Sequence, residues 1–472
     1  MTAPNETPHD PQPRRVLGLR DLVLFYVVAT LSLRWLPLAA ALGPSAIAIW
    51  LLGVLTIFLP LALCVMELSS RYPQEGGMYV WSKRAFGDFA GFLTGWIYWT
   101  SNLTYFPAVL YFAASNALYI GGSRWLKLQS SATFFIVFSL VGLALALFLN
   151  VIGLNIGKWL SNLGAIGTWV PVALLACVGI VAWSKFGSAT SFDSRSLSPT
   201  LKLSNFGVWT TILYAFAGAE ALSFMGGEVK RPRRDIPRAL IIAGFIVASA
   251  YILGTVAMLV VLPSEQYNSM EGIMQSIASS TARIGWYGLT PLMALLICVA
   301  NLGAVGAYLA ALARLPFVVG IDRYLPAAFA RVHPRWRTPY IALIVQALCS
   351  VVFVILGQAG SSVRGAYQVL VSMSIIANFI PYLFMFAALI RLQRVPAEAE
   401  VVRVPGGRRV AVALAVLGTV ATLVVIVGSV IPDASEPNKV LAVLKVVLLS
   451  AALVLGGAGL YWIGKRRLAA GN

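Results

Sequence analysis

Twelve long runs of apolar residues dominate this chain of 472 residues. A helix needs ~20 mostly apolar residues to cross ~30 Å of hydrocarbon at 1.5 Å per residue, and it satisfies its own backbone hydrogen bonds there. Charged residues make up only 11% of the sequence, well below the roughly 25% of soluble domains. The sequence therefore predicts an all-α integral membrane protein with about twelve transmembrane helices.

The predicted spans follow one another closely along the chain. Their approximate bounds are 18–41, 44–69, 87–120, 132–152, 159–183, 205–228, 238–262, 286–318, 339–357, 366–391, 408–431 and 439–463. The segments between them are at most about 20 residues long, too short to form a domain with its own core. Any function is therefore expected within the membrane.

Basic residues are distributed unevenly between the loops. With the N-terminus inside, 25 of the 35 lysine and arginine residues lie in cytoplasmic segments, eight in external loops, and two, Arg34 and Lys445, within spans. Cytoplasmic loops of membrane proteins carry such an excess of positive charge. The distribution predicts a multi-pass protein of the inner (cytoplasmic) cell membrane with both termini cytoplasmic. It explains the net charge of +18 without a nucleic-acid partner.

Two halves of the chain look comparable. Residues 18–183 and 205–391 each hold five predicted spans, and each half begins with a helix whose middle is poor in aliphatic residues. A repeated unit with an odd number of spans inserts in opposite orientations, as in inverted-repeat transporters. Residues 408–463 would add two helices. The polar, proline-rich residues 1–17 are predicted to be a disordered cytoplasmic tail, and 464–472 a short cytoplasmic tail.

The first predicted span has an unusual middle. Its centre contains Ser32, Leu33, Arg34, Trp35 and Pro37. A break near Pro37 is predicted because proline interrupts helical hydrogen bonding. Arg34 lies about sixteen residues into the span, or ~24 Å along it, and costs at least ~2.5 kcal/mol to insert. It either forms a structural ion pair between helices or serves substrate binding or coupling in a cavity.

The sixth predicted span is the second unusual segment. Its centre contains Tyr214, Phe216, Ala217, Gly218 and Glu220. A carboxylate in a membrane helix needs a partner or water. Glu220 is the natural partner of Arg34 if the middles of the two helices meet. Tyr214 and Phe216 either wall a substrate cavity or pack against neighbouring helices.

Other polar side chains also fall within or near spans. The third span carries a stripe formed by Tyr98, Asn102, Thr104 and Tyr105. This stripe must face protein or water, and helix packing explains it as well as a substrate site does. Glu67 lies just before Arg71 and is expected to have a structural capping role near the cytoplasmic interface. Lys445 can extend its amine to the external surface.

Residues 263–285 are too polar to cross a membrane and place isoleucine, methionine and serine at helical spacing. They predict an external amphipathic helix. Metal-ligand patterns do not emerge elsewhere: the histidines, His9 and His333, are isolated, and the four cysteines show no ligand spacing. Neither a metal nor a cofactor is therefore expected.

Three stretches together resemble the amino acid–polyamine–organocation transporter family. They are CVMELSSRYPQEGGMYVWSKRAFG at 64–87, GGEVKRPRRDIPRA at 226–239 and ARLPFVVGIDRYLPAAFARVHPRWRTPY at 313–340. The resemblance covers essentially 18–463. Two further stretches, EQYNSMEGIMQSI at 265–277 and VRVPGGRRVAVALAVLG at 402–418, look nearest to bacterial glutamate/GABA antiporter-like permeases.

The resemblance implies a LeuT-like five-plus-five inverted repeat with discontinuous helices 1 and 6 and a substrate site between them. It also implies a secondary active transporter, or permease, that moves amino acids or related amines across the cytoplasmic membrane by alternating access, with exchange or proton coupling. The family's sixth-helix pattern of aromatic, x, Phe, x, Gly, x, Glu falls on Tyr214, Phe216, Gly218 and Glu220. Relatives use the aromatic as a gate and the glutamate in coupling or gating.

The first helix departs from the family pattern. Many members have Gly-Ser-Gly or similar, whose exposed amides bind the substrate carboxylate, where this chain has Ser32, Leu33, Arg34 and Trp35. This departure indicates a modified substrate set, an anionic or small amino acid or an amine. The expected substrate-binding residues are Ser32, Leu33, Arg34, Trp35, Tyr98, Asn102, Tyr214, Phe216, Ala217 and Gly218. Those expected in coupling or gating are Glu220, Tyr214 and Arg34.

Two other classes of function compete with transport. A broken helix pair can also line an amino-acid-gated, amine-gated or passive channel, which steady conductance far above transporter turnover would reveal. A membrane-embedded enzyme would need a cluster of histidine, cysteine or carboxylate side chains on one cavity, and only Glu67, Glu220 and Arg34 are candidates. The partners expected for the transporter are a small-molecule substrate, the lipid bilayer and, if coupled, protons.

Overall fold

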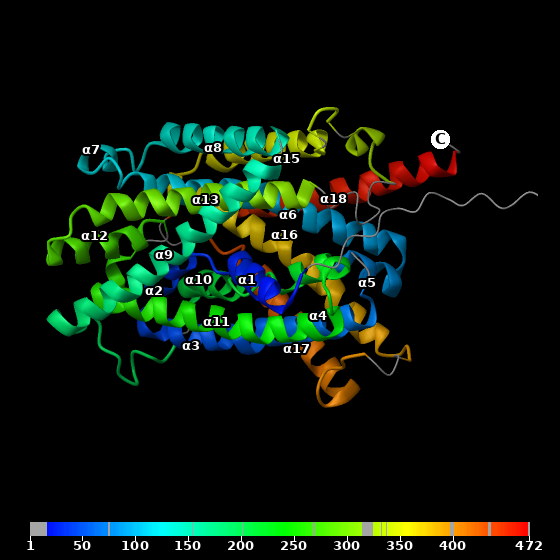
Figure 1. The fold of residues 1–472 in the computed structure, drawn as a ribbon, viewed down its shortest axis with the longest axis horizontal. Coiled ribbons are helices and arrows are strands. Elements are labelled where there is room, and N and C mark those ends of the chain that lie inside the picture. Colours follow the sequence, from blue (N-terminus) through cyan, green and yellow to red (C-terminus); the bar gives the residue numbers. More distant parts are fainter. Residues whose placement is uncertain are drawn as a thin grey trace, which may run out of the picture.

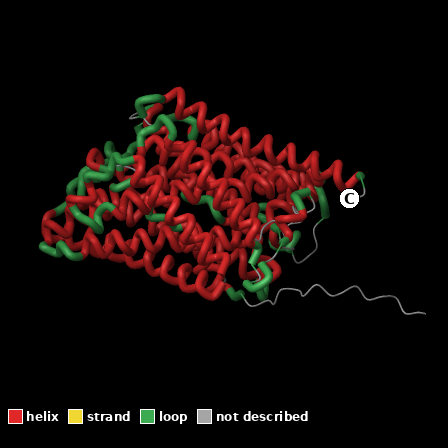
Figure 2. Tube along the Cα trace, turned by 90° about the horizontal axis from the view of Figure 1, so that it is seen from above, coloured by secondary structure: helices red, strands yellow, loops and turns green. Residues whose placement is uncertain are grey.

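The chain folds into helices that lie side by side along the longest axis of the molecule (Figure 1). The computed structural model describes residues 17–73, 76–152, 154–200, 202–267, 270–313, 324–331, 333–336, 338–396, 401–432 and 436–470. Most loops gather toward the two ends of the bundle, and short non-helical stretches lie inside it (Figure 2).

The α-helices are α1 (Leu19–Thr30), α2 (Trp35–Ala40), α3 (Ala46–Gly53), α4 (Leu59–Arg71), α5 (Gly77–Phe86), α6 (Asp88–Ala117), α7 (Ser123–Leu126), α8 (Ala132–Ile152), α9 (Leu154–Phe186), α10 (Leu203–Tyr214), α11 (Pro232–Val261), α12 (Gly272–Ile284), α13 (Leu289–Ala313), α15 (Tyr340–Gln358), α16 (Val363–Leu392), α17 (Gly407–Gly428) and α18 (Lys439–Ala469). The 3-10 helices are η1 (Gly43–Ser45), η3 (Ala219–Glu228), η4 (Ser264–Gln266) and η6 (Ala327–Ala330), and η2 (Val54–Phe58) is π-helical.

Each of the twelve predicted spans coincides with one helix or with consecutive helical segments. Within the described residues, eight helical stretches are long and apolar enough to cross a membrane. The predicted span 286–318 is observed as α13, and its residues 314–318 lie outside the described part of the chain. The last helix continues to Ala469, so most of the predicted tail 464–472 is helical. Of the predicted tail 1–17 only Leu17 is described, and it forms a bridge with Val229.

The first predicted span is broken near Pro37, as expected, over residues 31–34. Helix α1 ends at Thr30 and α2 begins at Trp35, so Pro37 lies in the first turn of α2, where its missing N–H is tolerated. The cause of the break is a contact from α11. The Tyr251 hydroxyl donates to the carbonyl of Thr30 at 2.7 Å and accepts from the N–H of Ser32 at 3.2 Å. These bonds replace part of the helical hydrogen bonding.

The sixth predicted span is also broken. Helix α10 ends at Tyr214, and the 3-10 helix η3 begins at Ala219. Between them, Gly218 has φ of +117°, a conformation that glycine adopts far more readily than other residues. A Cβ atom at this position would also lie 3.0 Å from Thr30 Oγ1. The backbone conformation of this break therefore favours glycine, and Gly218 lies against Thr30 of the first break.

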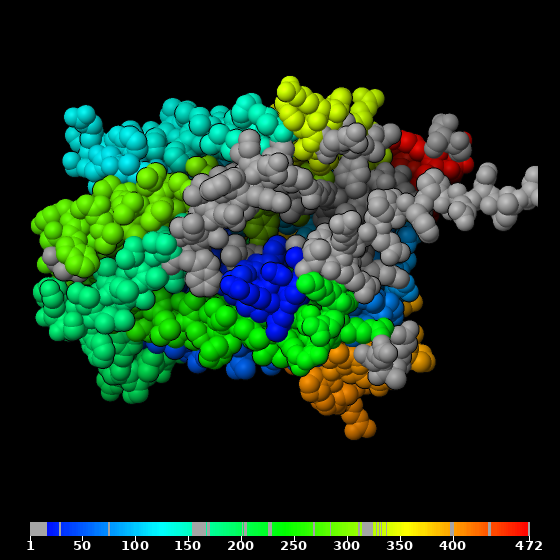
Figure 3. Space-filling model, in the orientation of Figure 1, coloured from blue at the N-terminus to red at the C-terminus, as the bar shows by residue number. Residues whose placement is uncertain are grey.

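Helices α6 and α16 pack in the interior, where most of their side chains are buried. Helices α8, α11, α17 and α18 instead present large apolar side chains outward, as lipid-facing helices do. Phe245 on α11 and Leu455 on α18, for example, are 75% and 69% exposed. Helix α1 reaches the surface beside α11 on the face shown in Figure 3. The exposed apolar surface fits a bilayer rather than water.

The predicted amphipathic segment 263–285 forms η4 and α12. Ile273, Met274 and Ile277 on α12 are at most 1% exposed. A Cβ atom at Gly272 would lie 2.6 Å from the Cβ of Pro37, so α12 is pressed against α2. The helical expectation is confirmed. The helix covers the end of the first broken span instead of lying apart from the bundle.

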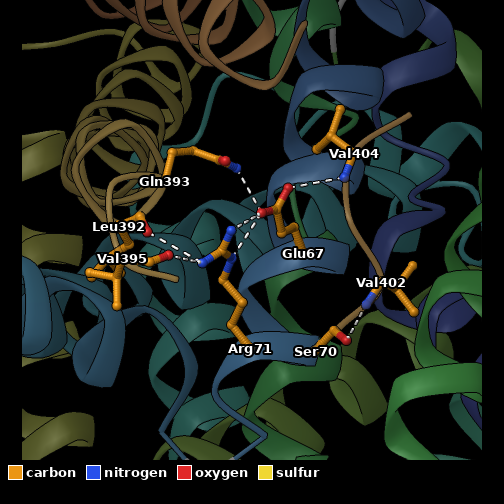
Figure 4. Close-up of polar contacts among 8 residues, drawn as sticks. All are labelled: Glu67, Ser70, Arg71, Leu392, Gln393, Val395, Val402 and Val404. Carbon is orange, nitrogen blue, oxygen red and sulfur yellow. Dashed lines mark hydrogen bonds and ion pairs between the residues drawn. The ribbon is translucent and has the colours of Figure 1, made fainter. Parts of the chain in front are cut away.

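Glu67 binds three partners, one in its own helix and two in other segments (Figure 4). Its Oε1 accepts from Arg71 Nε at 2.8 Å and from Gln393 Nε2 at 2.6 Å, and its Oε2 accepts from the N–H of Val404 at 3.0 Å. The side chains of Glu67 and Arg71 are 1% and 6% exposed. Glu67 thus joins α4 to the end of α16 and to the segment before α17, in agreement with the expected structural role.

Candidate functional site

A polar cavity of about 60 Å³ lies where the two helix breaks meet. This volume admits several water molecules or part of a small solute. Residues from both breaks, from α6, from α13 and from α16 form its wall. Nine of the wall residues were predicted for the site: Ser32, Arg34, Trp35, Tyr98, Asn102, Tyr214, Ala217, Gly218 and Glu220. Six others were not: Thr30, Tyr105, Ala215, Ala221, Tyr308 and Asn378.

Two expected site residues, Leu33 and Phe216, lie outside the cavity wall. Phe216 is 1% exposed and packs edge-on against Trp50 and Tyr251, with ring centroids 5.6 and 5.8 Å away. Trp50 and Tyr251 are themselves stacked at 4.5 Å. The break after α10 turns neighbouring side chains in different directions, so Phe216 faces this aromatic cluster while Tyr214 and Ala217 face the cavity. For Phe216, packing is the correct alternative.

Arg34 is 3% exposed and lies between two aromatic rings. Its Cζ is 4.1 Å from the ring centroid of Trp35 and 4.7 Å from that of Tyr105. Its Nε has no hydrogen-bond partner. Among the residues that the structure describes, Arg34 forms no ion pair, so the expected pair with Glu220 is not formed.

Glu220 is held by other groups. Its Oε2 accepts from the Tyr382 hydroxyl at 2.6 Å and from the N–H of Gly218 at 3.1 Å. The Gly218 N–H also donates to the Tyr382 hydroxyl at 3.1 Å. A buried carboxyl group is favoured only when donors satisfy it, and the break after α10 together with α16 supplies them. This arrangement explains why Glu220 does not reach across to Arg34.

Several residues of the site could not be recognised from the sequence. Tyr251 bonds the first break and also donates to the carbonyl of Ala215 in the second break, at 3.4 Å. Asn378 Nδ2 donates to the Tyr214 hydroxyl at 3.5 Å, and its Oδ1 is buried without a partner. Of the polar stripe on α6, Tyr105 faces the cavity, whereas Thr104 bonds Ser374 at 3.0 Å. Of the wall residues that were not predicted for the site, Tyr105 belongs to this stripe, which was the one sequence signal that pointed to it.

Packed side chains close the cavity on both sides along the bundle axis. On one side α12 covers α2, and Ser115 Oγ of α6 donates to the carbonyl of Met270 at 3.1 Å. On the other side Tyr98 stacks on Phe224, with centroids 5.1 Å apart. There α5 also meets η3, because a Cβ atom at Gly77 would lie 3.1 Å from the Cβ of Ser223. These contacts narrow the approaches to the cavity.

The arrangement agrees with comparisons to known proteins. A family model described as amino acid permease matches residues 17–452. An uncharacterized transporter of Legionella pneumophila is 30% identical over 460 residues, which is 95% of each chain. The serine/threonine exchanger SteT of Bacillus subtilis is 28% identical and covers 77% of this chain and 79% of its own length. A probable agmatine/putrescine antiporter of Lactococcus lactis, AguD, is 23% identical over 52% of each chain.

Proposed function

The chain belongs to the amino acid permease family of the amino acid–polyamine–organocation transporters, and from this premise we propose that it carries amino acids or related amines across the cytoplasmic membrane as a secondary active transporter. It is a membrane transporter and not an enzyme. The observation that carries the proposal is the polar cavity between two helix breaks, with a buried Arg34 and a buried Glu220 in its wall.

The proposed topology has twelve spans in a five-plus-five inverted repeat followed by two helices, with both termini in the cytoplasm. The twelve apolar segments, the matching interruptions in the first and sixth of them, and the excess of basic residues in alternate loops support it. In such transporters, the ends of the broken helices face substrate near the middle of the bilayer.

The proposed roles follow the cavity wall. Substrate contacts Ser32, Arg34, Ala217 and Gly218 at the breaks, with further contacts from Tyr98 and Asn102 on α6. Tyr214 acts as a gate: it lies edge-on to Trp35 at 5.6 Å and against Phe379 at 5.5 Å. Glu220 serves in coupling, because its carboxyl group can exchange a proton and bonds the very residue, Gly218, at which the helix is broken.

Uptake into proteoliposomes tests this function. Labelled amino acids and amines are supplied to vesicles that are empty or preloaded, with and without a pH gradient, for the wild type and for Glu220→Gln. Uptake that requires internal substrate identifies exchange. Uptake that requires the gradient and is lost in Glu220→Gln identifies proton coupling through Glu220. If no amino acid or amine moves under any condition, the proposed function is wrong.

A further inference from the structure

Arg34 contributes a positive charge to the cavity without an acidic partner among the described residues. Its natural partner, Glu220, is instead bound by Tyr382 and by the backbone of Gly218. A buried cation is costly unless a negative charge approaches it. The guanidinium of Arg34 therefore has no directly bonded anion in the described part of the chain, and a carboxylate on the solute would supply one.

The aromatic neighbours of Arg34 determine which of its groups can bind a solute. The ring centroids of Trp35 and Tyr105 lie 4.1 and 4.7 Å from the guanidinium carbon. The ring faces attract the cation without offering a lone pair to its N–H groups, which remain available to another partner. These donors match the two oxygens of a carboxylate. The Nε–H is buried without an acceptor, as expected for a donor whose partner is the transported solute.

The backbone at the first break also favours Arg34 as the partner of a carboxylate. The N–H of Ser32 already donates to the Tyr251 hydroxyl at 3.2 Å. This amide is therefore used to hold the break and not to bind a carboxylate. The positive side chain two residues later, Arg34, is the group that can replace it.

The same wall carries unpaired acceptors. Asn378 Oδ1 and Thr30 Oγ1 are both buried, without hydrogen-bond partners, and belong to residues that line the cavity. An ammonium group supplies the donors that they lack. A cavity that combines an unpaired guanidinium with these acceptors matches a solute that carries a carboxylate and an ammonium group together.

We propose that Arg34 is the carboxylate-binding residue of this transporter and that its substrates are small zwitterionic amino acids, to the exclusion of diamines and other purely cationic amines. This inference rests on the proposed transport function. Arg34 attracts a carboxylate, whereas a solute with only ammonium or guanidinium groups would leave the buried guanidinium unpaired beside a second positive charge. The small volume and the surrounding aromatic rings favour short side chains.

Matched ligands test the inference on the wild-type protein. Alanine and serine are compared with alaninamide, ethanolamine and putrescine, both as competitors of amino acid uptake and as ligands that raise the melting temperature of the purified transporter. Alaninamide replaces the carboxylate of alanine by an amide, ethanolamine is serine without its carboxylate, and putrescine is a diamine without any carboxylate. We expect stabilisation and competition from the amino acids, with an effect at least about tenfold weaker from the others, because a charge-assisted bond is lost.

Variants of Arg34 complete the test. Arg34→Gln should lose the preference for the carboxylate ligands, and Arg34→Lys should retain a weaker form of it, because lysine keeps the charge without the planar donors. Arg124→Gln, at an exposed arginine of α7, is the matched control and should behave as the wild type. If Arg34→Gln does not fold, the matched ligands on the wild type and on the Arg34→Lys variant still test whether Arg34 binds the carboxylate.

The outcomes separate the two proposals. Uptake of putrescine or alaninamide as efficient as that of alanine overturns the inference while the transport function stands. Binding of alanine that depends on Arg34 without any uptake supports the inference and overturns the transport function. Absence of both binding and uptake for every amino acid overturns both.

Discussion

Tyr251 holds both helix breaks through a single hydroxyl group. It bonds Thr30 and Ser32 at the first break and Ala215 at the second. In Tyr251→Phe, buried backbone groups at both breaks lose their partner, which costs about 1–3 kcal/mol. We expect a lower melting temperature and reduced uptake. Tyr287→Phe, at a tyrosine that is 70% exposed, is the control. Unchanged stability in Tyr251→Phe would show that water replaces the hydroxyl.

Gly218 is the residue of the second break that has a positive φ. In Gly218→Ala, the added methyl group meets Thr30 Oγ1 at 3.0 Å, in a backbone conformation with φ of +117°. Strain of this kind costs about 1–3 kcal/mol. We expect a strong loss of uptake with a smaller loss of melting temperature. Gly456→Ala in α18, where nothing lies within 4 Å, should be neutral. Normal uptake by Gly218→Ala would mean that the local conformation tolerates a side chain.

The sequence indicates the charged residues of the site better than the neutral ones. Arg34 and Glu220 stand out because a charge within an apolar run needs a special environment. Asn378 and Tyr251 lie in helices that hold many other polar or aromatic residues, and only packing brings them to the breaks. The pairing of Arg34 with Glu220 was a reasonable expectation, but the competing donors on Tyr382 and Gly218 are not recognisable before the helix breaks are placed.

At the scale of elements, the ion pair of Glu67 and Arg71 within α4 also bonds segments that are distant in the sequence. Glu67→Leu leaves Arg71 buried without its charge partner, and such losses cost about 3–5 kcal/mol. We expect a large drop in the melting temperature. The double variant Glu67→Leu/Arg71→Met should recover part of it because no unpaired charge remains. A double variant that melts lower than the single variant would contradict a role for charge burial.

The ion pair between Lys83 and Asp88 serves as the contrast. Its atoms are 2.8 Å apart, and its side chains are 43% and 51% exposed. The hydrogen bond that the Lys83 ammonium donates to Asp88 raises the pKa of Lys83 above its usual 10.5. The stability that this pair adds through Lys83 is therefore fully present below the pKa of lysine in the unfolded chain. It is lost only as the pH rises through the raised pKa of the folded protein. Exposed pairs contribute less than about 1 kcal/mol. Asp88→Asn should barely change the melting temperature between pH 6 and 8.

At the two breaks, residue types alone do not always indicate where a helix ends. Residues 31–34 contain neither glycine nor proline, so the residue types there do not mark the break, although it falls near Pro37 as expected. A tyrosine on a distant helix bonds the open backbone groups. The second break does have a local signal in Gly218, whose positive φ needs glycine. Helices with a continuous apolar pattern, such as α8 and α15, were placed to within a residue.

For the whole molecule, alternating access requires the contacts that close the cavity to open in turn. Cysteines at Pro37 and Gly272 would place their Cβ atoms close together, at 2.6 Å before relaxation, and a disulfide needs about 3.8 Å. We expect oxidation of Pro37→Cys/Gly272→Cys to stop uptake and a reductant to restore it. The two single variants are the controls. Full uptake by the oxidised pair would show that α12 and α2 stay together during transport.

Hydropathy alone indicates an all-helical membrane protein and locates its apolar segments, because bilayer thickness sets their length. It does not reveal that α12 lies pressed on α2, or that η3 packs against α5, because these contacts join segments far apart in the sequence. The architecture of the bundle is thus largely predictable, whereas the closure of the cavity depends on tertiary contacts.

The charge of Arg34 also has a consequence for the carrier when it is empty. A fixed positive charge beside a narrow cavity is a barrier to other cations, as arginines are in water-conducting pores that exclude protons. A membrane that stores energy as a proton gradient loses it through any pathway that hydrated protons can follow. Between transport events, the same side chain that we assign to substrate binding would limit the leak of protons through this protein.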